Sequence, residues 1–179
     1  MTQPHIVAIG GTTRPSSSTA RALEAALAAT ERLGARTTLL TGPAIDFPNF
    51  EPDGGEPSPE VAQFIATIRD ADGIIIGSPG YHGTLSGLVK NALDHVELTA
   101  RDERPYFTGM PVGLIATAAG WQAAVTTLTS LRSIVHALRG WPTPIGITIN
   151  SSEGPDPLLR AGLPIETMAA QMMDFLTHR

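Results

Sequence analysis

The sequence alternates five times between a short apolar run and a longer segment with the periodicity of a helix. The apolar runs cover residues 5–10, 35–40, 73–77, 111–117 and 144–149. Strands that alternate with helices favour an open parallel sheet, because the crossover helices cover its faces and the connections are right-handed. We therefore predict an α/β fold with five parallel strands and helices on both faces, in a single domain that spans residues 1–179.

The helical segments carry their own start signals. The first is expected over residues 18–33, and Ser58 with Pro59 supplies an N-cap and a first-turn proline for the second. Trp121 opens the apolar stripe of the fourth helix, so we expect its side chain in the core. The last helix is expected over residues 165–177.

Two further segments are expected to be long loops. Residues 41–59 hold five prolines and three glycines, and a loop of this length in a compact domain favours a functional or partner-facing role. Residues 151–164 would form either a lid or a dimer arm, and the sequence favours neither.

Composition restricts the chemistry of the chain. It has no cysteine, which excludes disulfides, thiolate metal sites and iron–sulfur clusters, so a redox function would need a cofactor. The net charge of −5 argues against a nucleic-acid partner, because a polyanion is bound by clustered lysine and arginine. The apolar runs are too short for a membrane helix and the first residues lack a signal-peptide pattern, so we expect no membrane partner and a cytoplasmic location.

A hydroxyl-rich stretch follows the first apolar run. Six of the eight residues from Thr12 to Thr19 carry a hydroxyl group, and Arg14 lies among them. The stretch matches neither GxxxxGK[ST] nor GxGxxG, which weakens the case for a nucleoside triphosphate or a dinucleotide. Free amides at a helix N-terminus, hydroxyl donors and an arginine suit a terminal phosphate. In the simpler alternative, Ser18 or Thr19 caps the helix and the rest is polar loop.

Two more segments follow strands whose carboxyl ends share one edge of such a sheet, where ligands bind. SPGYHG (78–83) is expected to be a tight turn from which Tyr81 and His82 project toward a flat ring; the alternative is an ordinary turn with a capping aromatic. ATAAG (116–120) has small residues that let a planar ligand approach the backbone. We predict no catalytic side chain, because His82 has no identifiable nucleophile to activate, and no metal site.

Taken in this order, the three segments resemble the NAD(P)H-dependent FMN reductase family of flavodoxin-like proteins. That family carries a GSxRxxSxN-type loop after its first strand, where this sequence has GTTRPSSST over residues 11–19. It carries PxYxGSxxGxLKNxLD after its third strand, where this sequence has PGYHGTLSGLVKNALD over residues 79–94. Thr19 stands in place of the frequent Asn and Thr84 in place of the frequent Ser, and each places a hydroxyl group there.

The resemblance implies a flavodoxin-like sheet with strand order 2-1-3-4-5 and FMN as the cofactor. The hydroxyl loop would hold the FMN phosphate, residues 79–83 would line the ribityl chain and the isoalloxazine, and residues 118–120 would lie beside the ring. The candidate cofactor-binding residues are Thr12, Arg14, Ser17, Ser18, Thr19, Pro79, Gly80, Tyr81, His82, Gly83, Ala118, Ala119 and Gly120.

The resemblance also implies an activity and an assembly. The family transfers a hydride from NADPH or NADH to flavin N5, and the reduced flavin then serves a small-molecule electron acceptor. Its members are commonly homodimers or homotetramers, in which Lys90 and Asp94 would lie at a subunit contact; the alternative is a solvated ion pair.

Alternatives stay open at this point. The chain would be an FMN reductase, a quinone or chromate-type reductase with bound FMN, a non-catalytic flavodoxin-like electron carrier, or a phosphate-ester-binding domain without a redox role. The sequence does not distinguish NADPH from NADH, or retained FMN from exchanged FMN.

Overall fold

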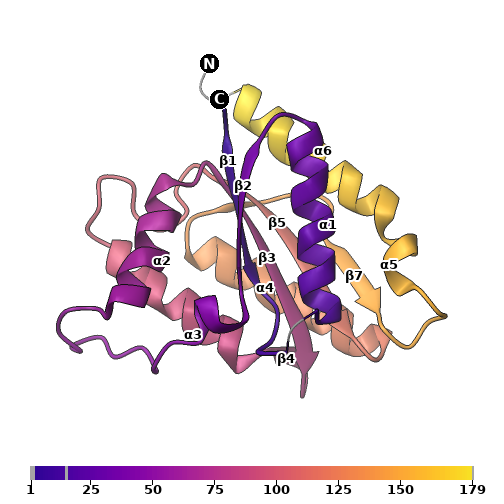
Figure 1. The fold of residues 1–179 in the computed structure, drawn as a ribbon, viewed down its shortest axis with the longest axis horizontal. Coiled ribbons are helices and arrows are strands. Elements are labelled where there is room, and N and C mark those ends of the chain that lie inside the picture. Colours follow the sequence, from indigo (N-terminus) through magenta and orange to yellow (C-terminus); the bar gives the residue numbers. More distant parts are fainter. Residues whose placement is uncertain (1–2, 15, 179) are drawn as a thin grey trace.

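The computed structural model describes residues 3–14 and 16–178, and a mostly parallel sheet lies at its centre (Figure 1). Its main strands follow the order β2-β1-β3-β5-β6, and β7 also pairs with β5. Their bounds are β1 His5–Gly10, β2 Arg36–Thr41, β3 Gly73–Tyr81, β5 Pro111–Ala118, β6 Trp141–Pro142 and β7 Ile147–Asn150. The predicted parallel α/β fold is confirmed, but the sheet has seven strands and not five.

Helices cover both faces of the sheet (Figure 1). On one face α1 and α6 share a buried cluster with Ile6 and Ala8 of β1; on the other, α2, α3 and α4 share a cluster with Val7 and Ile9. This alternation along one strand is the period-2 pattern of a strand buried on both sides. The helices are α1 Ser18–Arg32, α2 Pro59–Asp70, α3 Gly87–Asp94, α4 Trp121–Ala137, α5 Pro157–Arg160 and α6 Gly162–Thr177. None within the described ranges is long and apolar enough to cross a membrane.

The third strand is longer than predicted, since the prediction ended it at Gly77. It continues through Tyr81 and forms a short antiparallel hairpin with β4 (Thr84–Leu85). His82 and Gly83 form the two-residue turn with φ of 50° and 95°, the left-handed backbone that such hairpins require. The tight turn predicted over 78–83 is therefore wrong in extent, because cross-strand pairing extends the strand beyond the buried apolar run.

The edge of the sheet beside β5 also differs from its prediction. One strand over 144–149 was expected, but two short strands, β6 and β7, pair with β5. Val112 pairs with Pro142 and Ile115 with Ile147, so the edge holds two more residues than β5 over this interval. Arg132 of α4 donates to the carbonyls of Thr143 (3.2 Å) and Pro144 (3.1 Å), which satisfies backbone that the sheet leaves unpaired. From the other face, Gln171 of α6 accepts a hydrogen bond from the Ile145 amide (3.1 Å).

The proline-rich loop is fastened to α3 by one side chain. Asn91 donates to the carbonyls of Phe47 (3.1 Å) and Pro48 (3.0 Å) and accepts from the Phe50 amide (2.9 Å). His95 packs edge-on against both Phe47 and Phe50. The segment begins with a 3₁₀ turn at Gly42–Ile45 and then follows α3, so its path is set by backbone contacts that its own sequence does not reveal.

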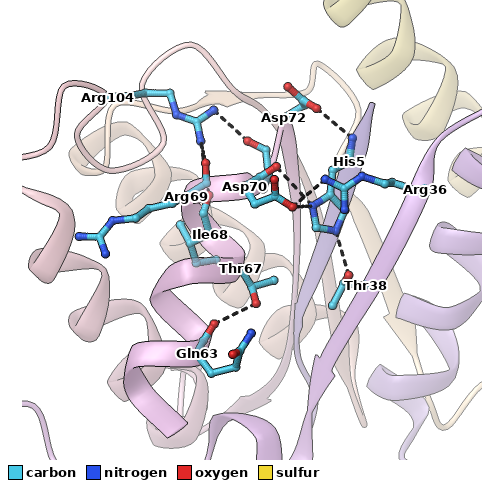
Figure 2. A network of polar contacts seen from close by, with 11 residues as sticks. His5, Arg36, Thr38, Gln63, Thr67, Ile68, Arg69, Asp70, Asp72 and Arg104 are labelled. Carbon is cyan, nitrogen blue, oxygen red and sulfur yellow. Dashed lines mark hydrogen bonds and ion pairs between the residues drawn. The ribbon is translucent and has the colours of Figure 1, made fainter. Parts of the chain in front are cut away.

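A polar network joins α2 to the first two strands at the end of the sheet where β1 begins (Figure 2). His5 is buried, donates its backbone amide to Asp72 (2.9 Å), and lies with Nε2 at 2.8 Å from the Thr38 hydroxyl. Arg36 donates to the Asp70 carboxylate at 2.6 Å, and the His5 ring nitrogen Nδ1 lies 3.1 Å from the same oxygen. These contacts fix the register of β1 and β2 far from the carboxyl edge of the sheet.

We expect the Asp70 contacts to stabilise the fold at neutral pH and to weaken in acid. The hydrogen bond from Arg36 lowers the pKa of the Asp70 carboxyl below its ordinary value, and the charges of Arg36 and His5 add to this. A depressed folded-state pKa contributes stability above the unfolded value of about 3.9, and the contribution disappears as the pH falls through the folded value. Asp70→Asn should therefore lower the urea midpoint at pH 7 and differ less from wild type at about pH 3.

Asp53→Asn is the matched control. Asp53 lies in the exposed proline-rich loop and makes no ion pair with any residue in the described ranges. An Asp70→Asn midpoint deficit that stayed constant between the two pH values would contradict this assignment.

Candidate functional site

The carboxyl ends of β1, β3 and β5 border a cavity of about 400 Å³. This volume lies in the range of small-molecule sites, roughly 300–1,000 Å³. Ten of the predicted cofactor-binding residues line it, whereas His82, Gly83 and Gly120 do not, and Thr117 and Ser151 are additional. The lining residues are Thr12, Arg14, Ser17, Ser18, Thr19, Pro79, Gly80, Tyr81, Thr117, Ala118, Ala119 and Ser151.

Two glycines let the first loop leave the sheet beside β3. Gly10 and Gly11 have φ of 144° and 93°, values that L side chains rarely adopt. A Cβ on Gly10 would lie 1.8 Å from the Gly77 carbonyl oxygen, so the backbones of the two residues approach too closely for a side chain at this position. The Gly11 amide donates to that same carbonyl at 3.1 Å, which holds the start of the loop against the end of the β3 core.

The N-terminus of α1 opens into the cavity. Ser17 is the N-cap and accepts from the Ala20 amide (3.1 Å), so the alternative in which Ser18 or Thr19 caps the helix is wrong. No residue in the described ranges accepts a hydrogen bond from the backbone amides of Ser18 or Thr19. These amides and the exposed Ser18 hydroxyl are available to an anion at the positive end of the helix dipole.

Thr12 shapes the loop and leaves the arginine free. Its hydroxyl accepts from the Arg14 amide at 3.1 Å and lies 3.4 Å from the Arg14 carbonyl oxygen. Arg14 lines the cavity, and within residues 3–14 and 16–178 its guanidinium has neither an ion pair nor a hydrogen bond. Pro15, the next residue of the motif, lies outside the described residues.

Thr19 differs from the other hydroxyls of this loop. Its side chain is 1% exposed, and its Oγ1 lies 2.6 Å from Thr117 Oγ1 of β5, which is also buried. This pair joins α1 to β5 beneath the cavity. The Thr19 hydroxyl is therefore engaged in structure, and Thr117 is a site residue that the sequence interpretation missed although it lies within the ATAAG segment.

The end of β3 forms a second wall. The Ser78 hydroxyl donates to the Pro79 carbonyl (2.8 Å) and accepts from the Ser86 amide (2.9 Å), which ties the hairpin to the start of α3. Tyr81 lines the cavity and is 53% exposed. Gly80 lies against α4, because a Cβ there would approach Thr127 Oγ1 to 2.6 Å.

The third wall comes from β5 and the segment after β7. The Ser151 amide donates to the Ala118 carbonyl (2.8 Å), which places Ser151 in the cavity lining.

Trp121, expected in the core, is 48% exposed. Its indole N–H donates to Glu153, which also accepts from Arg160 (3.1 Å). Trp121 lies at the surface because it begins α4, where its indole N–H can reach Glu153 in the segment 151–160.

The electrostatics of the lining favour an anion. Arg14 contributes a positive charge, and the lining residues include no carboxylate. In the described part of the chain, no group of three or more His, Cys, Asp or Glu side chains is arranged to hold a metal ion.

Comparisons with known proteins identify the family of this chain. The model of the family described as NADPH-dependent FMN reductase matches residues 4–153. An FMN-dependent NADPH-azoreductase of Staphylococcus haemolyticus (strain JCSC1435) is 34% identical over 109 residues, which cover 61% of this chain and 54% of that protein. The matched region thus spans about half the length of the curated relatives.

Solved structures share the fold at low sequence identity. An oxidoreductase from Corynebacterium diphtheriae superposes with a TM-score of 0.75 at 18% identity and covers 99% of this chain and 98% of its own. A flavodoxin, WrbA-like protein from Agrobacterium tumefaciens has a TM-score of 0.68 at 18% identity, with 99% and 100% covered. The fold is flavodoxin-like, and the chain belongs to the NADPH-dependent FMN reductase family.

Proposed function

We propose that the chain is an NAD(P)H-dependent oxidoreductase that binds FMN in the cavity at the carboxyl ends of β1, β3 and β5. One observation carries the proposal: one cavity without carboxylates is lined by Arg14, which is unpaired among the described residues, and by Ser18 and Thr19, whose amides are free there. A phosphate monoester matches this donor set, because it offers several acceptor oxygens and a negative charge.

The rest of the cavity fits the remainder of FMN. Pro79, Gly80, Ala118 and Ala119 are small or rigid, which leaves room for a planar ring system close to the backbone. Tyr81, half exposed at the mouth, offers an aromatic edge or face to such a ring. We assign His82 and Gly83 to the hairpin turn and Gly120 to the start of α4, outside direct contact with the cofactor.

The side chains of the lining would bind and orient. When bound, FMN would supply the redox chemistry, the acceptance of a hydride from a reduced nicotinamide and the transfer of its electrons to an acceptor. Arg14 and the α1 amides would hold the phosphate, and the Thr19–Thr117 pair would keep α1 in register with β5. The described lining has no carboxylate or imidazole to act as a proton donor or acceptor, in keeping with a protein that leaves the chemistry to the cofactor.

The acceptor, assembly and location complete the proposal. The azoreductase name of the curated relatives supports a small organic molecule, such as an azo compound or a quinone, as electron acceptor. Val125, Trp141, Leu159 and Leu163 are 51–78% exposed, and such apolar side chains support a homodimer or homotetramer. We place the reaction in the cytoplasm, where reduced nicotinamide nucleotides are available.

The test is a flavin titration followed by a turnover assay. We expect FMN fluorescence to be quenched on addition of the protein, and NADPH or NADH to be oxidised when FMN and an acceptor are both present. Omission of FMN from fully flavin-free protein should abolish the oxidation.

Two other outcomes have clear meanings. Absence of both FMN binding and nicotinamide oxidation would refute the proposal. Binding of FMN without turnover of either nucleotide would support a flavodoxin-like electron carrier in its place.

A further inference from the structure

A hollow of about 300 Å³ lies between the proline-rich loop, α2 and the 3₁₀ turn His95–Thr99 that follows α3. Phe50 of the loop, Val61 of α2 and Leu98 of the 3₁₀ turn give it apolar walls. It shares no lining residue with the cavity at the carboxyl ends of β1, β3 and β5. The proposed flavin site therefore leaves this space unused, and its volume is sufficient for a small aromatic molecule.

His95 brings a hydrogen-bond acceptor without a partner to the hollow. The residue is 6% exposed and lines the hollow, and its Nδ1 lies 2.9 Å from the Asn91 carbonyl oxygen. Because a carbonyl oxygen only accepts, Nδ1 carries the proton, and the neutral ring has its lone pair on Nε2. Nε2 makes no hydrogen bond with any residue in 3–14 and 16–178, and the atom is not sealed from solvent. A ligand with an N–H or O–H group can therefore reach Nε2 from the hollow.

The charged groups of the hollow select a cation. Glu51 and Glu56 line it, and neither carboxylate forms an ion pair with any described residue. None of the described lining residues is a lysine or an arginine. In the same part of the chain, no group of three or more His, Cys, Asp or Glu side chains is arranged to hold a metal ion. An organic cation fits this lining better than a metal ion or an anion.

We propose that the hollow binds a protonated arylalkylamine, an aromatic ring joined by a short alkyl chain to an ammonium group. The ammonium group has three donors and no acceptor, so it can donate to Nε2 of His95 while the carboxylates of Glu51 and Glu56 attract its charge. The aromatic ring packs on Phe50, Val61 and Leu98. The inference does not depend on the proposed function, because the two sites have no residue in common.

The binding test uses 2-phenylethylamine and its neutral analogue 2-phenylethanol, with and without FMN. We expect saturable binding of the amine with a Kd of about 1 mM, the affinity typical of a ligand of this size, and binding of the alcohol at least about fivefold weaker. In a long-range ¹H–¹⁵N spectrum of labelled protein, the amine should shift the Nε2 signal of His95. Saturating FMN should leave the Kd of the amine within about twofold.

Two kinds of variant separate the charge from the acceptor. The double variant Glu51→Gln, Glu56→Gln should weaken the amine by about three- to tenfold and the alcohol by less than about twofold, since both carboxylates are exposed. Asp53→Asn is the matched control, because Asp53 lies in the same loop but does not line the hollow, and it should change neither ligand. His95→Phe retains a ring against Phe47 and should weaken both ligands by about fivefold, because both donate to Nε2.

Each contrary outcome would overturn the inference. Absence of saturable amine binding, or an alcohol that bound as tightly as the amine, would refute a cation site. Displacement of the amine by FMN would place it in the flavin cavity. Equal losses in Asp53→Asn and the double glutamine variant would mean that overall charge, and not the lining of the hollow, attracts the amine. The glutamine variants keep this test decisive even if His95→Phe failed to fold.

Discussion

Replacement of Gly10 by alanine should destabilise the fold by about 4 kcal/mol, the combined effect of a strained backbone and a steric clash. The new Cβ would lie 1.8 Å from the Gly77 carbonyl oxygen, and that oxygen accepts the Gly11 amide. No side chain can rotate away to relieve the clash, so β1 and β3 must separate where the first loop begins. Urea unfolding followed by far-UV circular dichroism measures the loss.

Gly34→Ala is the matched control for backbone strain without a clash. Gly34 follows α1 with φ of 97°, and a Cβ there would meet nothing within 4 Å. Its replacement should cost only about 1 kcal/mol, the usual penalty for a residue other than glycine in this backbone region. If the two variants lost equal stability, close approach of the backbones at Gly10 would not be the reason for the glycine.

Arg14→Ala should weaken FMN binding by roughly 10- to 100-fold, the range expected for a charge-assisted bond to phosphate. The substitution removes only the guanidinium, because the bond between the Thr12 hydroxyl and residue 14 uses the backbone amide. Riboflavin has the same ring and ribityl chain but no phosphate, so its affinity should change by less than about twofold. Fluorescence titration with both flavins gives the two ratios directly.

Arg32→Ala serves as the charge-matched control, since Arg32 lies at the other end of α1 from the phosphate loop and should affect neither flavin. Equal losses for FMN and riboflavin in Arg14→Ala would contradict a phosphate role and would instead indicate a disturbed loop.

The fold was largely predictable because its central strands are buried on both faces. Ile74, Ile75 and Ile76 are fully buried, and such continuous apolar runs are typical of parallel sheets. The site loops were predictable for a related reason: carboxyl ends of adjacent parallel strands share one edge, so segments far apart in sequence meet there. The binding role of these loops stays a prediction until the flavin titrations are done.

The errors lie where distant residues decide local structure. The last strand starts at Ile147 and not at residue 144, because Arg132 and Gln171 take up the backbone groups in between. Trp121 fits a helical apolar stripe, but its indole N–H is bonded to Glu153, which lies 32 residues later. Thr19 has the same hydroxyl as its neighbours, and only its partner Thr117 distinguishes it. Local periodicity contains none of these pairings.

The way in which Asn91 holds the proline-rich loop has a practical consequence for protein engineering. Its amide contacts only backbone atoms of Phe47, Pro48 and Phe50, so the anchor does not depend on the side chains of the loop. Phe47 is buried against Phe64 and His95 and must be kept. The exposed positions Glu51, Pro52, Asp53 and Glu56 are then free to be randomised in a library, since variants would inherit the same attachment to α3, whereas Gly55, with φ of 76°, should be kept.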